Sequence, residues 1–93
     1  MSRESVLSMI DRVERIADML PECSEREINS LGGQVIGTLQ AIVSELKRNG
    51  IPTSNEIISE MGDEFARTQN VNDAVFALHT AAGYLRGLAQ KLS

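Results

Sequence analysis

Apolar residues recur at intervals of three and four along most of this 93-residue chain, which is the spacing of amphipathic helices. The pattern predicts four helices of roughly 18, 25, 14 and 21 residues joined by short connections. No β-hairpin signal, internal repeat or change of composition interrupts it. We therefore expect a single all-α domain over residues 1–93. It should be a bundle of four helices in which the second and fourth are longest and form the central pair.

The helix boundaries are predicted from residues that cap or stop helices. Serine, threonine and asparagine accept the free amides of a first turn, whereas proline and an Asn-Gly pair end a helix. In chain order these signals are Ser2, Pro21, the Ser24-x-x-Glu27 capping box, Asn49-Gly50, the Thr53-x-x-Glu56 capping box and Asn70. They place the second helix over 24–48, leave the end of the third within 66–69, and start a fourth that runs to the end of the chain.

The fourth predicted helix lacks a charged face. Only three residues of 71–93 are charged, and the side opposite its apolar stripe carries Phe76, Thr80, Gly83 and Gly87. A helix that is apolar most of the way round is usually buried on both sides. A domain this small has little protein with which to cover both, so we expect this face to bind a second copy or another protein.

Two glycine pairs at a spacing of four reinforce this expectation: Gly33 with Gly37, and Gly83 with Gly87. Glycine inside a helix costs about 1 kcal/mol relative to alanine. Each pair lies opposite a bulky apolar seam, so each helix has a flat back that another backbone could approach closely. Two explanations within one chain stay open, namely a crossing of the second and fourth helices or a kink at Gly32-Gly33. The interface hypothesis includes all four glycines together with Phe76 and Thr80.

The charge balance is mildly acidic, with 13 acidic and 9 basic residues and a formal net charge of −4. This argues against nonspecific binding to nucleic acid or to an anionic membrane. The acidic residues are either solvated helix faces or a surface that docks on a basic partner. The candidates for such a surface are Glu14, Asp18, Glu22, Glu25, Glu56, Glu60, Asp63 and Glu64. Without a secretory signal or a membrane-spanning run, a cytoplasmic location is expected.

The residues that carry chemistry are sparse. His79 is the only histidine and Cys23 the only cysteine, so neither a zinc site nor an intrachain disulfide is expected. No carboxylate lies on an apolar helix face, and no nucleotide-binding loop is present. We expect no enzyme activity, catalytic residue, metal or cofactor. If a polar ligand pocket exists, His79, Tyr84 and Arg86 are its best candidates.

The stretch Gly50-Ile-Pro-Thr-Ser-Asn-Glu-Ile-Ile-Ser-Glu-Met-Gly62 resembles the first helix and turn of helix-turn-helix repressors, winged or ordinary. That resemblance implies a recognition helix shortly after the glycine, with basic or amide side chains for the DNA groove. Here Asp63-Glu64-Phe65 follows instead, and phosphate-neutralising cations are missing.

The sequence thus favours a small non-enzymatic protein–protein interaction or regulatory module that acts as a homo-oligomer and binds another protein. Small inhibitors encoded by phages and other mobile elements are of this kind, and a bacterial accessory protein would fit equally. The alternative is a nucleic-acid-linked regulator. It would be either an acidic mimic that blocks a nucleic-acid-binding protein or a helix-turn-helix DNA binder.

Overall fold

The computed structural model describes residues 3–53, 56, 59–60, 63 and 70–92. These ranges hold three α-helices and one 3₁₀ turn: α1 (Arg3–Met19), η1 (Leu20–Glu22), α2 (Glu25–Arg48) and α4 (Val71–Ala89). They contain no strand, so the all-α prediction is confirmed for this part of the chain. The prediction of four helices is wrong, because the described residues form three. The helix expected from residue 53 onward falls mostly outside the described residues.

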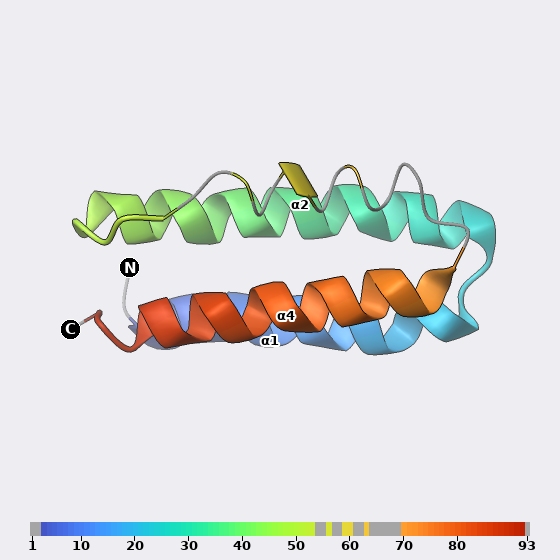
Figure 1. The fold of residues 1–93 in the computed structure, drawn as a ribbon, viewed down its shortest axis with the longest axis horizontal. Coiled ribbons are helices and arrows are strands. Elements are labelled where there is room, and N and C mark those ends of the chain that lie inside the picture. The colour runs from blue at the N-terminus through green and yellow to red at the C-terminus, as the bar shows by residue number, and fades with distance from the viewer. Residues whose placement is uncertain (1–2, 54–55, 57–58, 61–62, 64–69, 93) are drawn as a thin grey trace.

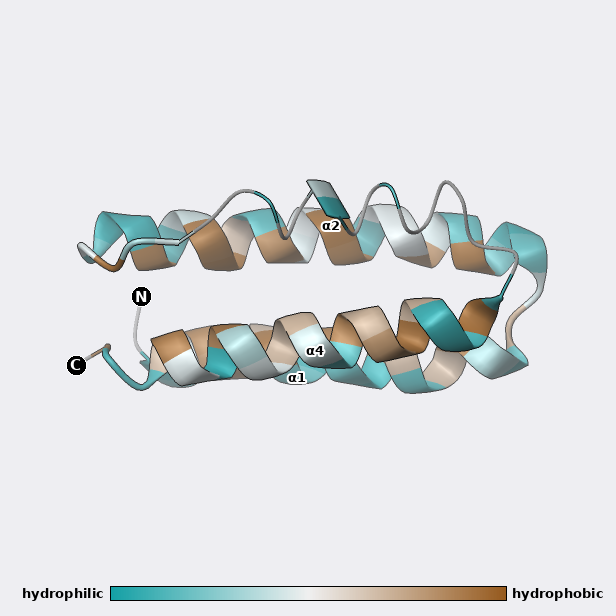
Figure 2. Ribbon diagram, viewed as in Figure 1, coloured by the Kyte–Doolittle hydropathy of each residue, from teal (hydrophilic) through white to brown (hydrophobic). Residues whose placement is uncertain are grey.

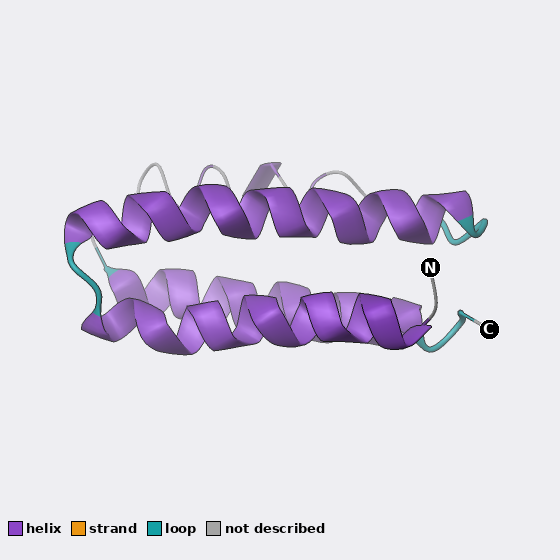
Figure 3. Cartoon of the chain, turned by 180° about the vertical axis from the view of Figure 1, so that it is seen from behind, coloured by secondary structure: helices purple, strands orange, loops and turns teal. Residues whose placement is uncertain are grey.

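Helix α1 is antiparallel to both α2 and α4 (Figure 1). It packs against each of them, whereas α2 and α4 make few contacts with one another. Helices α2 and α4 are the longest, as expected, with 24 and 19 residues against 17 in α1. The expectation that they form the central pair is wrong, because the shorter α1 lies between them in the packing. Seen from behind, α1 runs in front of α4 with α2 alongside (Figure 3).

The core is built from aliphatic side chains. The apolar side of α2 is directed toward α1 and α4 (Figure 2). The largest fully buried side chains are Ile10, Leu20, Leu39, Ile42, Leu46, Leu78, Leu85, Val6, Val13 and Val35. The Cα radius of gyration of 12.8 Å is close to the roughly 12 Å expected for a compact chain of this length. One core therefore serves the three described helices.

Both ends of α2 form as the sequence predicts. The Ser24 amide donates to Glu27 Oε1 at 3.1 Å, and the Glu27 amide donates to Ser24 Oγ at 3.3 Å, which completes the capping box. At the other end Gly50 adopts a left-handed φ of 77°. The Gly50 amide then donates to the Lys47 carbonyl, and the Ile51 amide to the Leu46 carbonyl at 2.9 Å. This is a Schellman motif, closed by burial of Ile51.

The remaining boundary predictions have mixed outcomes. Asn70 caps α4, because its Oδ1 accepts from the Asn72 amide at 2.9 Å. Helix α4 ends at Ala89 rather than at the chain end. The hydroxyl of Thr53 is buried and has no hydrogen-bond partner, so this half of the second capping box is not formed in the described structure. Ser2 lies outside the described residues.

Candidate interaction surfaces

The face of α4 opposite the core is uncovered. We call it the α4 back and define it as Phe76, Thr80, Gly83 and Gly87. All four are exposed, and the Phe76 side chain is 75% exposed. The opposite side of the helix is buried through Leu78, Ala82, Leu85 and Ala89 among others. The large aromatic ring of Phe76 is therefore exposed to solvent, on a helix whose other side is already buried in the core.

The one polar side chain of the α4 back is turned onto its own helix. Thr80 Oγ1 donates to the Phe76 carbonyl at 2.9 Å. Since the hydroxyl is engaged with the backbone, the remaining group of Thr80 is its methyl. From Phe76 to Gly87 the α4 back thus offers carbon surface and exposed backbone, without a charged side chain.

No packing contact within the described part of the chain explains the four exposed glycines of the two long helices. A Cβ atom built at Gly33, Gly37, Gly83 or Gly87 meets nothing within 4 Å. None of the four has a positive φ, so none is required by backbone conformation. A crossing of α2 and α4 at these glycines is therefore excluded. The kink predicted at Gly32-Gly33 is not formed either, because α2 is one continuous helix from Glu25 to Arg48 that runs straight in Figure 1.

The corresponding face of α2, the α2 back, contains Gly33 and Gly37 with Ser30, Gln40 and Ser44 at heptad-like spacing. All five are exposed. No residue from 28 to 44 is charged, so this surface is also small and flat. The α2 back and the α4 back belong to helices that barely meet. The predicted interface residues consequently form two separate surfaces rather than one.

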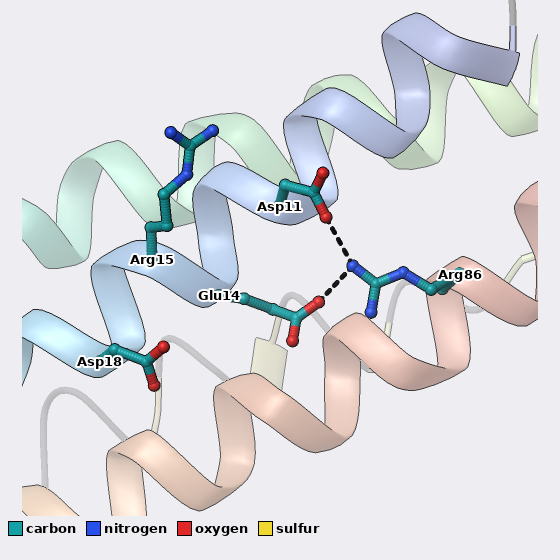
Figure 4. Close-up of a pocket in the computed structure, with 5 residues that line it drawn as sticks. All are labelled: Asp11, Glu14, Arg15, Asp18 and Arg86. Atoms are coloured by element: carbon teal, nitrogen blue, oxygen red, sulfur yellow. Dashed lines mark hydrogen bonds and ion pairs between the residues drawn. The ribbon is translucent and has the colours of Figure 1, made fainter.

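A polar cluster joins α1 to α4 beside the core, and its centre is Arg86. The Arg86 Nη2 atom lies 2.7 Å from Asp11 Oδ1 and forms a second ion pair with Glu14. Figure 4 shows both carboxylates directed at the guanidinium, whereas Arg15 points away. Hydrogen bonding to Glu14 is the main cause that raises the pKa of Arg86 above its ordinary value, with a smaller contribution from Asp11. Arg86 is therefore a fixed positive charge that clamps two helices.

His79 extends this cluster one turn further along α1. Its Nε2 atom lies 2.8 Å from Asp18 Oδ1, and its Nδ1 atom lies 3.3 Å from Glu14 Oε2. Residue numbers rise along α1 from Asp11 to Asp18, and those of the partners fall along α4 from Arg86 to His79. The antiparallel packing of the two helices requires this order. His79 is thus hydrogen-bonded to a carboxylate of α1. No group of three metal-binding side chains occurs in the described ranges.

The cluster borders an open depression of about 410 Å³ lined by Asp11, Glu14, Arg15, Asp18 and Arg86. Of the three residues predicted for a polar ligand pocket, Arg86 lines this depression, whereas His79 and Tyr84 do not. The guanidinium is already neutralised by two carboxylates, so it has little capacity to bind an anion. The chemistry that this arrangement supports is helix–helix attachment.

The acidic docking candidates do not form one free surface. Glu14 and Asp18 pair with residues of α4, and Glu22 and Glu25 are exposed at the turn between α1 and α2. Glu56, Glu60 and Asp63 are exposed, and Glu64 lies outside the described residues. A docking role for these residues stays a prediction.

Two residues escaped sequence reasoning. Asp11 was not a candidate, because nothing in the sequence shows that it faces Arg86 from 75 positions away. Glu45 is 3% exposed and adjoins the buried Leu46, so the prediction that no carboxylate lies on an apolar helix face is wrong. Its carboxylate receives a hydrogen bond from Asn49 at 3.3 Å and lies 3.5 Å from Arg48. In the sequence, the burial of Glu45 is indicated only by its neighbours Arg48 and Asn49 at the end of α2, which supply these two contacts.

The remaining chemical features are ordinary. Cys23 Sγ donates to the Met19 carbonyl at 3.3 Å, which ties the thiol to the end of α1. Among the helices of the described ranges, none combines the length and hydropathy needed to traverse a bilayer. The stretch that resembles helix-turn-helix repressors lies mostly outside the described residues.

Comparisons of the chain with protein-family models, curated proteins and solved structures find no match.

Proposed function

We propose that this chain is a non-enzymatic interaction module that self-associates through the α4 back. The α2 back is a second, separate contact surface that remains available to another protein. The observation that carries the proposal is a set of four exposed glycines at which an added Cβ would meet nothing within 4 Å among the described residues.

The energetic argument starts from helix propensity. Each mid-helix glycine destabilises its helix by about 1 kcal/mol relative to alanine. The monomer gains nothing in return, because an added Cβ would contact neither side chain nor backbone and no positive φ is involved. A close-packed partner helix would supply the missing compensation through van der Waals contact and Cα–H···O interactions. Exposure of Phe76 at 75% supports the same conclusion for α4.

The expected contact is small. Helix α4 has 19 residues and is therefore about 28 Å long. One helix face of that length buries an area near the lower end of stable protein–protein interfaces. We therefore expect reversible, concentration-dependent association rather than an obligate oligomer. A module of this kind exchanges partners readily.

Alanine substitution separates the role of these glycines in folding from their role in association. In Gly83→Ala and Gly87→Ala, each monomer should gain up to about 1 kcal/mol of unfolding free energy, because helix propensity improves without a clash. The same variants should associate more weakly, because the Cβ prevents close approach of a partner backbone. Denaturant unfolding at low concentration and sedimentation equilibrium at high concentration measure the two quantities.

Ser8→Ala is the matched control, since Ser8 is exposed on α1 and away from both glycine surfaces. It should change monomer stability by a few tenths of a kcal/mol through propensity alone. Its association should equal that of the unsubstituted chain. Unchanged association in both α4 variants would contradict the proposal, whatever happens to their stability.

A further inference from the structure

The α4 back has different properties at its two ends. Phe76 is the large residue near one end, and Gly87 is the smallest possible residue near the other, with Thr80 and Gly83 between them. Residues 76 and 87 lie at equal distances from a point between 81 and 82, and so do residues 80 and 83. A twofold axis through that point would place each large residue of one copy opposite a small residue of the other.

The charges at the two ends of α4 are also opposite. Asp73 is in the first turn of α4, and Lys91 is in the turn that follows the helix. The 19 residues of α4 span about 28 Å, so the two charges lie at opposite ends of the proposed contact. Both are exposed, and neither forms an ion pair within the described part of the chain.

We infer that two copies of this chain pair through their α4 helices in antiparallel orientation about a twofold axis near residues 81–82. Phe76 then lies over Gly87 of the partner subunit, and Asp73 lies near Lys91 of the partner subunit. This arrangement rests on the proposed self-association and specifies its geometry. The surface is self-complementary, as a twofold interface must be.

The parallel alternative fails on the same residues. It would oppose Phe76 to the partner's Phe76 and glycine to glycine, which prevents contact at one end and leaves a void at the other. It would also place the two Asp73 carboxylates together and the two Lys91 ammonium groups together. Antiparallel packing instead brings each Asp73 carboxylate near a Lys91 ammonium group. It also sets the two helix dipoles antiparallel to each other.

Charge reversal distinguishes the two orientations. Asp73→Lys and Lys91→Asp should each weaken association about tenfold at low salt, because two attractive pairs per dimer become repulsive. The double variant Asp73→Lys/Lys91→Asp should recover association to within about twofold of the unsubstituted chain, since its pairs are again opposite. All differences should shrink at about 1 M salt, where exposed charges are screened. Sedimentation equilibrium measures each dissociation constant.

A control accounts for the loss of negative charge from a helix start. Glu25→Lys makes the same change in the first turn of α2, outside the α4 back. It should lower monomer stability as Asp73→Lys does, yet leave the dissociation constant unchanged. Circular dichroism at the concentrations used shows whether each variant is folded.

Two results would overturn the antiparallel arrangement. If both single reversals and the double variant associate like the unsubstituted chain, the copies associate in another way, and the proposed function survives. The same holds if the double variant is weaker than either single variant. If the unsubstituted chain does not associate at all, the antiparallel arrangement and the proposed function fail together.

Discussion

Arg86 of α4 and Asp11 of α1 form an ion pair at 2.7 Å between these two antiparallel helices. Their contact fixes the register of α4 along α1, because only one antiparallel offset brings them together. The side chains are 38% and 59% exposed, so solvent screens the attraction. The contact should therefore contribute to specificity of register more than to stability.

A double-mutant cycle with Arg86→Met and Asp11→Asn should give a coupling free energy of about 0.5 kcal/mol. Arg86→Met alone should cost more than Asp11→Asn, because Arg86 also pairs with Glu14. Urea unfolding of the four proteins at low concentration measures the cycle. A coupling of zero would mean that the ion pair does not persist in solution.

The capping box at the start of α2 should be measurable by itself. The substitution Ser24→Ala removes the hydroxyl that accepts a hydrogen bond from the Glu27 amide. It should lower the unfolding free energy by about 1 kcal/mol. The control is Ser30→Ala, at an exposed mid-helix position of the same helix. That variant should be neutral or slightly more stable, since alanine is the better helix former. Equal effects in the two variants would rule out a capping contribution.

The same box makes stability depend on pH with a definite sign. Hydrogen bonds from the Ser24 backbone amide, and then from its side chain, lower the pKa of Glu27 below its ordinary value of 4.5. Because the folded pKa is the lower one, the unfolded chain binds more protons in this range. The contribution is complete above the unfolded pKa and is lost as the pH falls through the folded pKa. In Glu27→Gln, unfolding free energy should therefore fall less steeply below about pH 5. An unaltered slope would contradict this assignment.

Substitution of glycine by alanine should change the unfolding free energy in opposite directions at Gly50, just after α2, and at Gly37, within α2. Gly50→Ala places a Cβ at a φ of 77° and should cost about 1 kcal/mol through backbone strain. Gly37→Ala lies in regular helix and should gain up to about 1 kcal/mol. Neither Cβ meets another atom within 4 Å, so packing does not confuse the comparison. Denaturant unfolding at low concentration should show the two signs, and a gain at Gly50 would refute the left-handed conformation.

The sequence predicted local structure well because its signals are local. Capping at Ser24 and Asn70 and the stop at Asn49-Gly50 each involve residues within a few positions of one another. The end of α4 was missed, since no stop signal precedes the turn at Gln90.

Relations between helices could not be predicted in the same way. Which helix is central depends on how three apolar stripes fit together, and helix length does not report that. The partnership of Arg86 with Asp11 and Glu14 needs the register of α1 against α4, which periodicity leaves open. Burial of Glu45 likewise depends on what surrounds the end of α2. Exposure of Phe76, in contrast, was predictable, because one helix cannot direct two opposite faces into a single small core.

The central claim is that another copy of the chain covers the α4 back. Sedimentation velocity of the unsubstituted protein from micromolar to near-millimolar concentration tests it most directly. We predict a reversible rise in weight-average mass from that of the 10.2 kDa monomer toward twice that value. A mass that stays at the monomer value over the whole range would contradict the account.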